Sequence, residues 1–132
     1  MAKVLDASAL MAYLGREDGY EHVRDLFIKA AGADRNLLMT TVNWGEVYYL
    51  LIRDYGHQEA EQIRSLIDTF PVEFVPADIE LTKQAAVYKA EKKLPFVDCF
   101  AAALAKRRKA ELVTADKDFK VVEGEIKIVW IV

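Results

Sequence analysis

Cysteine is nearly absent from this sequence. Cys99 is its only representative, so no disulfide can form within the chain, and a single thiol among 132 residues is typical of a reducing compartment. No run of about 18 apolar residues occurs that could span a membrane. The first segment, Met1–Asp6, reaches an acidic residue too early for a signal peptide. We therefore expect a cytoplasmic protein with no membrane segment, and we interpret Cys99 as a small core residue.

Positive charge is also scarce. Lys and Arg number 18 against 21 Asp and Glu, a formal net charge of −3, which argues against a protein that holds nucleic acid through a broad basic surface. A nuclease remains possible, because clustered carboxylates can bind a metal ion that supplies the positive charge. The two histidines, His22 and His57, lack the spacing of zinc ligands, and we interpret them as solvated helix residues.

Proline and glycine are few, and they interrupt the chain only at intervals. Between them, apolar residues recur with helical spacing or form short strands. A hydrophobic fraction of 53% suffices for a core, and we expect one domain over residues 1–132. The pattern predicts these strands: Lys3–Asp6, Leu37–Thr40, Val72–Val75, Glu111–Thr114 and Lys127–Val132. It predicts these helices: Ala7–Leu14, Tyr20–Ala31, Asn43–Tyr55, Gln58–Phe70, Asp78–Lys93 and Phe96–Arg108.

Strands rich in Val, Leu and Ile that alternate with helices are typical of the α/β class, in which a parallel sheet carries helices on both faces. Right-handed crossovers bring the carboxyl ends of all strands to one edge of the sheet. Ligands bind at that edge, near the point where the strand order reverses. Polar residues that follow the strands are therefore the candidates for a functional site.

Four acidic residues stand at strand ends or near helix starts. Asp6 ends the first strand and Asp116 follows the fourth, so they face each other if these strands are neighbours. Glu46 and Asp98 each lie about one turn inside a helix that begins or ends at the same edge. Asp98 is the most informative, because an acid in so apolar a helix is costly unless it is paired or bound to a metal.

Each of these acids also has a purely structural interpretation. Asp6 and Asp116 can cap the turns that follow them, and Asp98 suits the helix dipole. Glu46 lies three residues after Asn43, which is the spacing of a capping box. Independent caps, however, have no reason to converge on one edge of the sheet. Clustered carboxylates repel one another, and hard divalent cations such as Mg²⁺ remove that penalty.

Four segments, in order along nearly the whole chain, resemble the motifs of the PIN-domain nucleases. Within that family the sequence is similar to the VapC toxins of toxin–antitoxin pairs. The segments are Val4–Leu10, Asn43–Val47, Val97–Ala102 and Thr114–Phe119. The resemblance implies a PIN-like three-layer α/β/α sandwich around a central parallel sheet of about five strands. It also implies a Mg²⁺- or Mn²⁺-dependent endoribonuclease, a homodimer, and inhibition by a cognate antitoxin protein.

The resemblance also assigns roles to residues by motif position. The acidic site it implies consists of Asp6, Glu46, Asp98 and Asp116, and its polar neighbours are Ser8, Asn43 and Thr114. We expect one ion on Asp6, Asp98 and Asp116, with Glu46 or Asp116 aligning the attacking water. The last motif holds a second acid, Asp118, which could share the role of Asp116, although Asp116 is nearer the strand end.

The RNA needs basic groups near the same edge. The candidates are Lys92 and Lys93, which precede the helix of Asp98, and Lys117 in the last motif. The cations of Lys106–Lys109 fit better as charges that favour a helix C-terminus. The helix stretch Glu46–Tyr55 is apolar on more sides than one sheet contact requires, so we expect part of it to be buried in a twofold dimer.

Three alternatives to a toxin nuclease stay open at this point. A phospho-accepting receiver domain is also doubly wound and acidic, but it needs paired acids at the first strand, and here Asp6 is alone. A non-catalytic α/β binding module would keep the acids as caps only. A PIN nuclease of RNA processing would have no antitoxin, and the neighbouring gene distinguishes it from a toxin.

Overall fold

The computed structural model describes residues 1–132, and its elements alternate between strands and helices. The strands are β1 (Lys3–Leu5), β2 (Leu37–Thr40), β3 (Val72–Val75), β4 (Glu111–Thr114) and β5 (Ile128–Trp130). The helices are α1 (Ala7–Leu14), α2 (Tyr20–Gly32), α3 (Thr41–Tyr55), α4 (His57–Ile67), α5 (Ile79–Glu91), α6 (Phe96–Arg108) and a 3-10 helix, η1 (Lys117–Val122).

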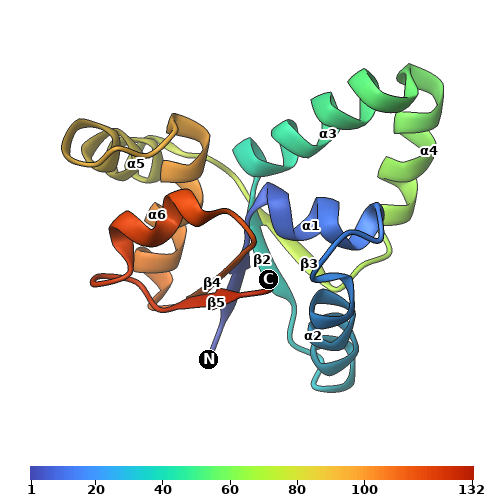
Figure 1. Cartoon of the computed structure of the whole chain (residues 1–132), viewed down its shortest axis with the longest axis horizontal. Coiled ribbons are helices and arrows are strands. Elements are labelled where there is room, and N and C mark those ends of the chain that lie inside the picture. The colour runs from blue at the N-terminus through green and yellow to red at the C-terminus, as the bar shows by residue number, and fades with distance from the viewer.

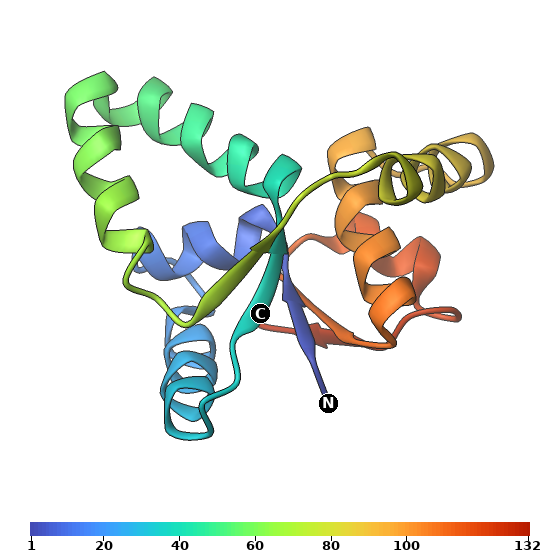
Figure 2. The same cartoon turned by 180° about the vertical axis from the view of Figure 1, so that it is seen from behind.

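All five strands form one parallel sheet in the order β3-β2-β1-β4-β5. The order reverses between β1 and β4, where Leu5 lies opposite Val113. Helices α1 to α4 lie on one side of the sheet and α5 and α6 on the other (Figures 1 and 2). The predicted α/β fold with a five-stranded parallel sheet between helices is confirmed, and so is the expected pairing of the first and fourth strands.

The central strands of the sheet are buried on both faces, which explains why they are mostly apolar. Side chains alternate between the faces of a strand. Val4 therefore packs in the core beneath α5 and α6, and Leu5 packs in the core beneath α1 to α4. Leu112 and Val113 on β4 divide in the same way. Cys99 is completely buried in the first of these cores, as predicted.

Several element boundaries differ from the prediction. Helix α3 begins at Thr41, because the hydroxyl of Thr40 accepts a hydrogen bond from the backbone N–H of Asn43 at 3.0 Å. Thr40 is thus the cap, and the expected capping box of Asn43 and Glu46 is wrong. Helix α4 ends at Ile67 rather than Phe70, β5 is shorter than expected, and η1 was not predicted.

Other local features agree with the sequence pattern. Asp78 caps α5 by accepting a hydrogen bond from the N–H of Leu81 at 2.8 Å. His22 and His57 are both exposed on helices, as expected. None of the helices combines the length and the apolar character that a membrane crossing requires.

Candidate active site

The four predicted acids come together at the carboxyl edge of the sheet, beside the point where the strand order reverses. Asp6 directly follows β1, and Asp116 lies two residues beyond the end of β4. Glu46 projects from the second turn of α3 and Asp98 from the first turn of α6. All four line one open pocket of about 420 Å³. Side chains that are far apart in the sequence therefore share one cavity.

Asp6 is fixed by hydrogen bonds from two hydroxyl groups and one backbone amide. The Ser8 hydroxyl lies 2.8 and 2.9 Å from its two carboxylate oxygens, and the Thr114 hydroxyl donates to Oδ2 at 2.5 Å. The N–H of Ala9 donates to Oδ1 at 2.9 Å, so Asp6 is also the cap of α1. The structural interpretation of Asp6 as a cap is correct, and the same side chain lines the acidic pocket.

The same hydroxyls also hold the loop that follows β4. Ser8 Oγ accepts a hydrogen bond from the N–H of Ala115 at 3.0 Å, and Thr114 Oγ1 accepts one from the N–H of Asp116 at 2.9 Å. With their oxygens occupied in this way, both hydroxyls direct their protons toward Asp6. Burial still raises the pKa of Asp6 to about 6, because its exposed fraction is only 2%.

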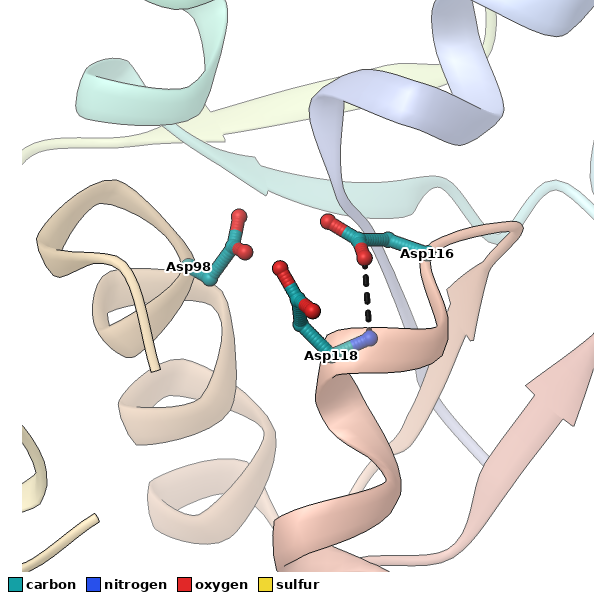
Figure 3. Close-up of side chains that lie close together, drawn as sticks. All are labelled: Asp98, Asp116 and Asp118. Atoms are coloured by element: carbon teal, nitrogen blue, oxygen red, sulfur yellow. Dashed lines mark hydrogen bonds between the residues drawn. The ribbon is translucent and has the colours of Figure 1, made fainter. Parts of the chain in front are cut away.

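Asp98, Asp116 and Asp118 form the tightest group of carboxylates in the pocket region. One oxygen from each lies within 4.8 Å of the others, and the three side chains point toward one another (Figure 3). Asp116 also accepts a hydrogen bond from the N–H of Asp118 at 2.9 Å, which caps η1. This turn brings Asp118 beside Asp98, so that Asp118 belongs to the group although it is farther from the end of β4 than Asp116.

Asp98 has the most perturbed acidity of the site. It is 7% exposed, and burial, followed by repulsion from Asp116, Asp6 and Glu46, raises its pKa to about 8. Burial and the charge of Asp116 also raise the pKa of Glu46. None of these four acids forms an ion pair with a Lys, Arg or His. A set of converging oxygen donors that have no ion-pair partner in the protein fits a hard divalent metal ion.

Asn43 connects the two helices that carry Glu46 and Asp98. It is completely buried on α3, and its Nδ2 donates to the carbonyl oxygen of Val97 on α6 at 3.2 Å. Its Oδ1 accepts a hydrogen bond from the hydroxyl of Thr40. The predicted polar neighbour of the site thus fixes helices relative to each other, and its amide is already used within the protein.

The three lysines proposed for RNA binding do not line this pocket. Lys92 forms an ion pair with Glu125 at 3.1 Å. Lys93 is exposed and is not among the residues that line the pocket. Lys117 lies over the ring of Trp130, 4.5 Å from its centroid, and donates to the carbonyl oxygen of Val132 at 3.2 Å. The three lysines therefore lie outside the pocket that holds the four acids, and their part in RNA binding stays a prediction.

The only cation that lines the pocket is Arg53, which the sequence reasoning missed. It lies on α3 seven residues after Glu46, and Leu50 between them lines the pocket as well. The spacing i, i+4, i+7 marks one face of a helix. This spacing is a signal that could have identified Arg53 once Glu46 had been assigned to the site.

Comparisons with known proteins agree on the fold. The PIN domain family model matches residues 3–125. No curated protein matches the sequence. Among solved structures, DNA-bound VapBC from Salmonella typhimurium superposes with a TM-score of 0.79 at 16% identity, covering 100% of this chain and 99% of that one. For VapBC2 from Rickettsia felis, bound to a promoter DNA fragment, the TM-score is 0.75 at 16% identity, with 98% of each chain covered.

A third solved structure is similar over the same length. Mycobacterium tuberculosis VapC20, described as a sarcin-ricin loop cleaving toxin, has a TM-score of 0.67 at 21% identity, covering 96% of this chain and 98% of that one. At such identities the likeness establishes a shared fold, and the arrangement of the acids must be judged from this chain's own residues.

Proposed function

Because the chain belongs to the PIN domain family, we propose that it is a Mg²⁺- or Mn²⁺-dependent endoribonuclease, the toxin of a toxin–antitoxin pair. The observation that carries the proposal is the convergence of Asp6, Glu46, Asp98 and Asp116, from four distant segments, on one pocket. Burial, followed by repulsion from the other three acids, raises the pKa of Asp98, and no basic side chain forms an ion pair with any of the four. Protein stability alone does not require such a cluster.

The donor set suits a divalent cation held by Asp98 and Asp116, with Asp118 and Asp6 beside them. Such an ion, when bound, polarises the scissile phosphate and favours ionisation of the attacking water. The remaining steps belong to the protein. Asp6 stays oriented because Ser8 and Thr114 donate to it. Glu46, whose pKa is raised, is placed to accept a proton from the water that attacks phosphorus.

The toxin role and the partners belong to the same proposal. The VapBC structures from Salmonella typhimurium and Rickettsia felis share this fold, and a VapBC protein of Mycobacterium tuberculosis that also shares it is described as a member of the VapBC family of toxin–antitoxin systems. We propose that this chain likewise binds a cognate antitoxin protein, forms a homodimer and acts in the cytoplasm. Its substrate would be RNA with unpaired nucleotides, since proteins select RNA mostly through loops and single strands rather than through the deep groove of the duplex.

The variant Asp6→Asn tests the enzymatic proposal. Asn caps helices about as well as Asp, so we expect the variant to fold with a melting temperature within a few degrees of wild type. Loss of one negative charge from the site should reduce Mg²⁺-dependent RNA cleavage by roughly 100-fold or more. Cleavage of a labelled RNA in Mg²⁺, in Mn²⁺ and in chelator, alongside thermal melts, measures both quantities.

Asp78→Asn is the matched control for this experiment. Asp78 caps α5 with the same backbone geometry as Asp6 caps α1, but it lies outside the acidic pocket. It should therefore leave cleavage unchanged. A wild-type protein that cleaves no RNA in either metal would contradict the nuclease proposal, and an Asp6→Asn variant of full activity would remove Asp6 from the site.

A further inference from the structure

The acidic pocket has an outer rim that the proposed chemistry does not use. Beyond the four inner acids, the pocket is lined by Glu17 and Asp18 from the segment between α1 and α2, and by Arg53 and Asp54 from the end of α3. The rim is therefore asymmetric. The segment between α1 and α2 contributes only negative charge, whereas the end of α3 contributes Arg53, the single cation of the pocket, together with Asp54. A phosphate of an entering RNA strand is repelled by Glu17 and Asp18 and is attracted by the guanidinium of Arg53 when this group turns away from Asp54.

Arg53 lies on the same face of α3 as Glu46, but farther from the reacting group. Seven residues of α-helix separate the two Cα atoms by about 10 Å along the axis. The intervening pocket residue on that face is Leu50, which is uncharged. A guanidinium at this place is suited to a phosphate that flanks the one under attack, because under the proposed function the attacked phosphate lies at the group of acids that includes Glu46 and Asp98.

The guanidinium of Arg53 is free to change partners. Its side chain is 66% exposed, and its ion pair is with the adjacent residue Asp54, at 3.0 Å. An exposed pair of this kind contributes little to stability, so breaking it costs little. The planar fork of arginine matches two oxygens of a phosphate, and the resulting hydrogen bonds are stronger than those between neutral groups.

We propose that Arg53 forms a phosphate subsite that binds the phosphodiester next to the one cleaved, so that the RNA strand runs along α3 and away from Glu17 and Asp18. This inference rests on the proposed ribonuclease function and adds the path of its substrate. Arg53 touches the substrate away from the reacting atoms and binds it equally in the ground state and the transition state. Its loss should therefore raise KM and leave kcat nearly unchanged.

The first test is kinetic. We expect Arg53→Ala to raise KM for a fluorescein-labelled single-stranded RNA of mixed sequence about tenfold, with kcat within about twofold of wild type. Arg53→Lys, which keeps the charge but loses the fork, should recover only part of the affinity. Asp18→Asn, in the segment between α1 and α2 that also lines the pocket, should lower KM, because it removes a repulsive charge.

The second test measures binding and needs no catalysis. Anisotropy of the same RNA is titrated with metal-free protein at several salt concentrations. Loss of one phosphate contact to a single strand reduces the slope of log K against log salt by about 0.7. We expect this reduction for Arg53→Ala. Arg24→Ala is the matched control, because Arg24 also forms an exposed ion pair with the residue that follows it, Asp25, at 3.1 Å, outside the pocket.

The outcomes separate this inference from the proposed function. Equal effects of Arg53→Ala and Arg24→Ala, no effect of either, or a fall in kcat at constant KM would each overturn the phosphate subsite while leaving the nuclease intact. An Arg53-dependent salt slope in a protein that cleaves nothing would uphold the subsite and reject the nuclease.

Discussion

Asp98 lies among alanine and phenylalanine residues on α6, and it faces Asp116, Asp6 and Glu46. Its pKa is about 8 in the folded protein, against an ordinary value of 3.8 that an unfolded chain would keep. Between these two pH values the folded state therefore binds more protons at this position than the unfolded state does. The contribution of Asp98 to stability is fully present below about pH 4 and is lost as the pH rises toward 8.

This titration predicts a pH-dependent gain of stability in Asp98→Asn. In metal-free buffer, the free energy of unfolding of the variant should exceed that of wild type by an amount that grows between pH 4 and pH 8. We expect a growth of about 1–2 kcal/mol, less than the full shift implies because the pocket is open to solvent. Urea unfolding in chelator at pH 4, 6 and 8 measures the difference.

Because wild type and Asp98→Asn share all other acidic residues, the difference between their free energies of unfolding reports mainly the titration of Asp98. Mg²⁺ added at pH 8 should stabilise wild type, because the ion binds the folded site, and should close the gap to the variant. If the free energies of unfolding of wild type and Asp98→Asn differed by the same amount at every pH, folding would not favour the neutral form of Asp98.

At the scale of elements, the site depends on how α3 is fixed against α6. Asn43 makes this connection through the carbonyl of Val97, and it also receives the hydroxyl of Thr40. Asn43→Ala removes both side-chain hydrogen bonds and leaves the buried Thr40 hydroxyl without an acceptor for its proton, which should lower the free energy of unfolding by about 2 kcal/mol. Denaturant unfolding measures this cost, and RNA cleavage should fall as Glu46 and Asp98 lose their mutual placement.

Asn36→Ala provides the comparison for this substitution. Asn36 is exposed and precedes β2, so its removal should change stability by no more than about 0.5 kcal/mol. If the two alanine variants proved equally stable, the link between α3 and α6 would not depend on the Asn43 amide.

Element types were predictable from the sequence, whereas several of their ends were not. The apolar runs of β1 and β4 and the helical spacing of α6 are local signals. The end of α4 is decided by contacts that are distant in the sequence. Phe70 lies beyond the helix and packs against Tyr13, with ring centroids 5.4 Å apart, and against Phe27, with ring centroids 5.3 Å apart. The cap at Thr40 was not predicted, because Thr40 is also the last residue of the buried strand β2, and the apolar pattern of a strand does not indicate that its last residue caps the next helix.

The candidate site divides in the same way. The sequence was enough to predict that four acids lie together, because a parallel sheet places the carboxyl ends of all its strands at one edge. These acids are Asp6, Glu46, Asp98 and Asp116. The place of Asp118 depends on the unpredicted η1 turn, and that of Arg53 on the direction in which α3 leaves the sheet. Lys92 and Lys117 have their contacts outside the pocket, with Glu125 and with the ring of Trp130, because nearness in sequence to Asp98 or Asp116 does not determine where a long flexible side chain finds its partner.

At the scale of the whole molecule, α3 presents apolar side chains that neither core absorbs. Val47 and Leu51 are buried beneath it, but Tyr49 and Tyr55 remain 54% and 51% exposed, and Ile52 is only partly covered. Exposed aromatic residues in one region are typical of protein interfaces. A twofold axis beside α3 would bury the same residues of both copies at once.

We therefore expect wild type to sediment at micromolar concentration with twice the chain mass of 15.0 kDa. The double variant Tyr49→Ser and Tyr55→Ser should sediment with the mass of one chain, because its interface loses two aromatic anchors. Ile28→Ser, on α2 and 64% exposed, removes a comparable apolar group from another face and should leave the dimer intact. A wild-type mass of one chain would reject the dimer, and a dimeric double variant would move its interface away from α3.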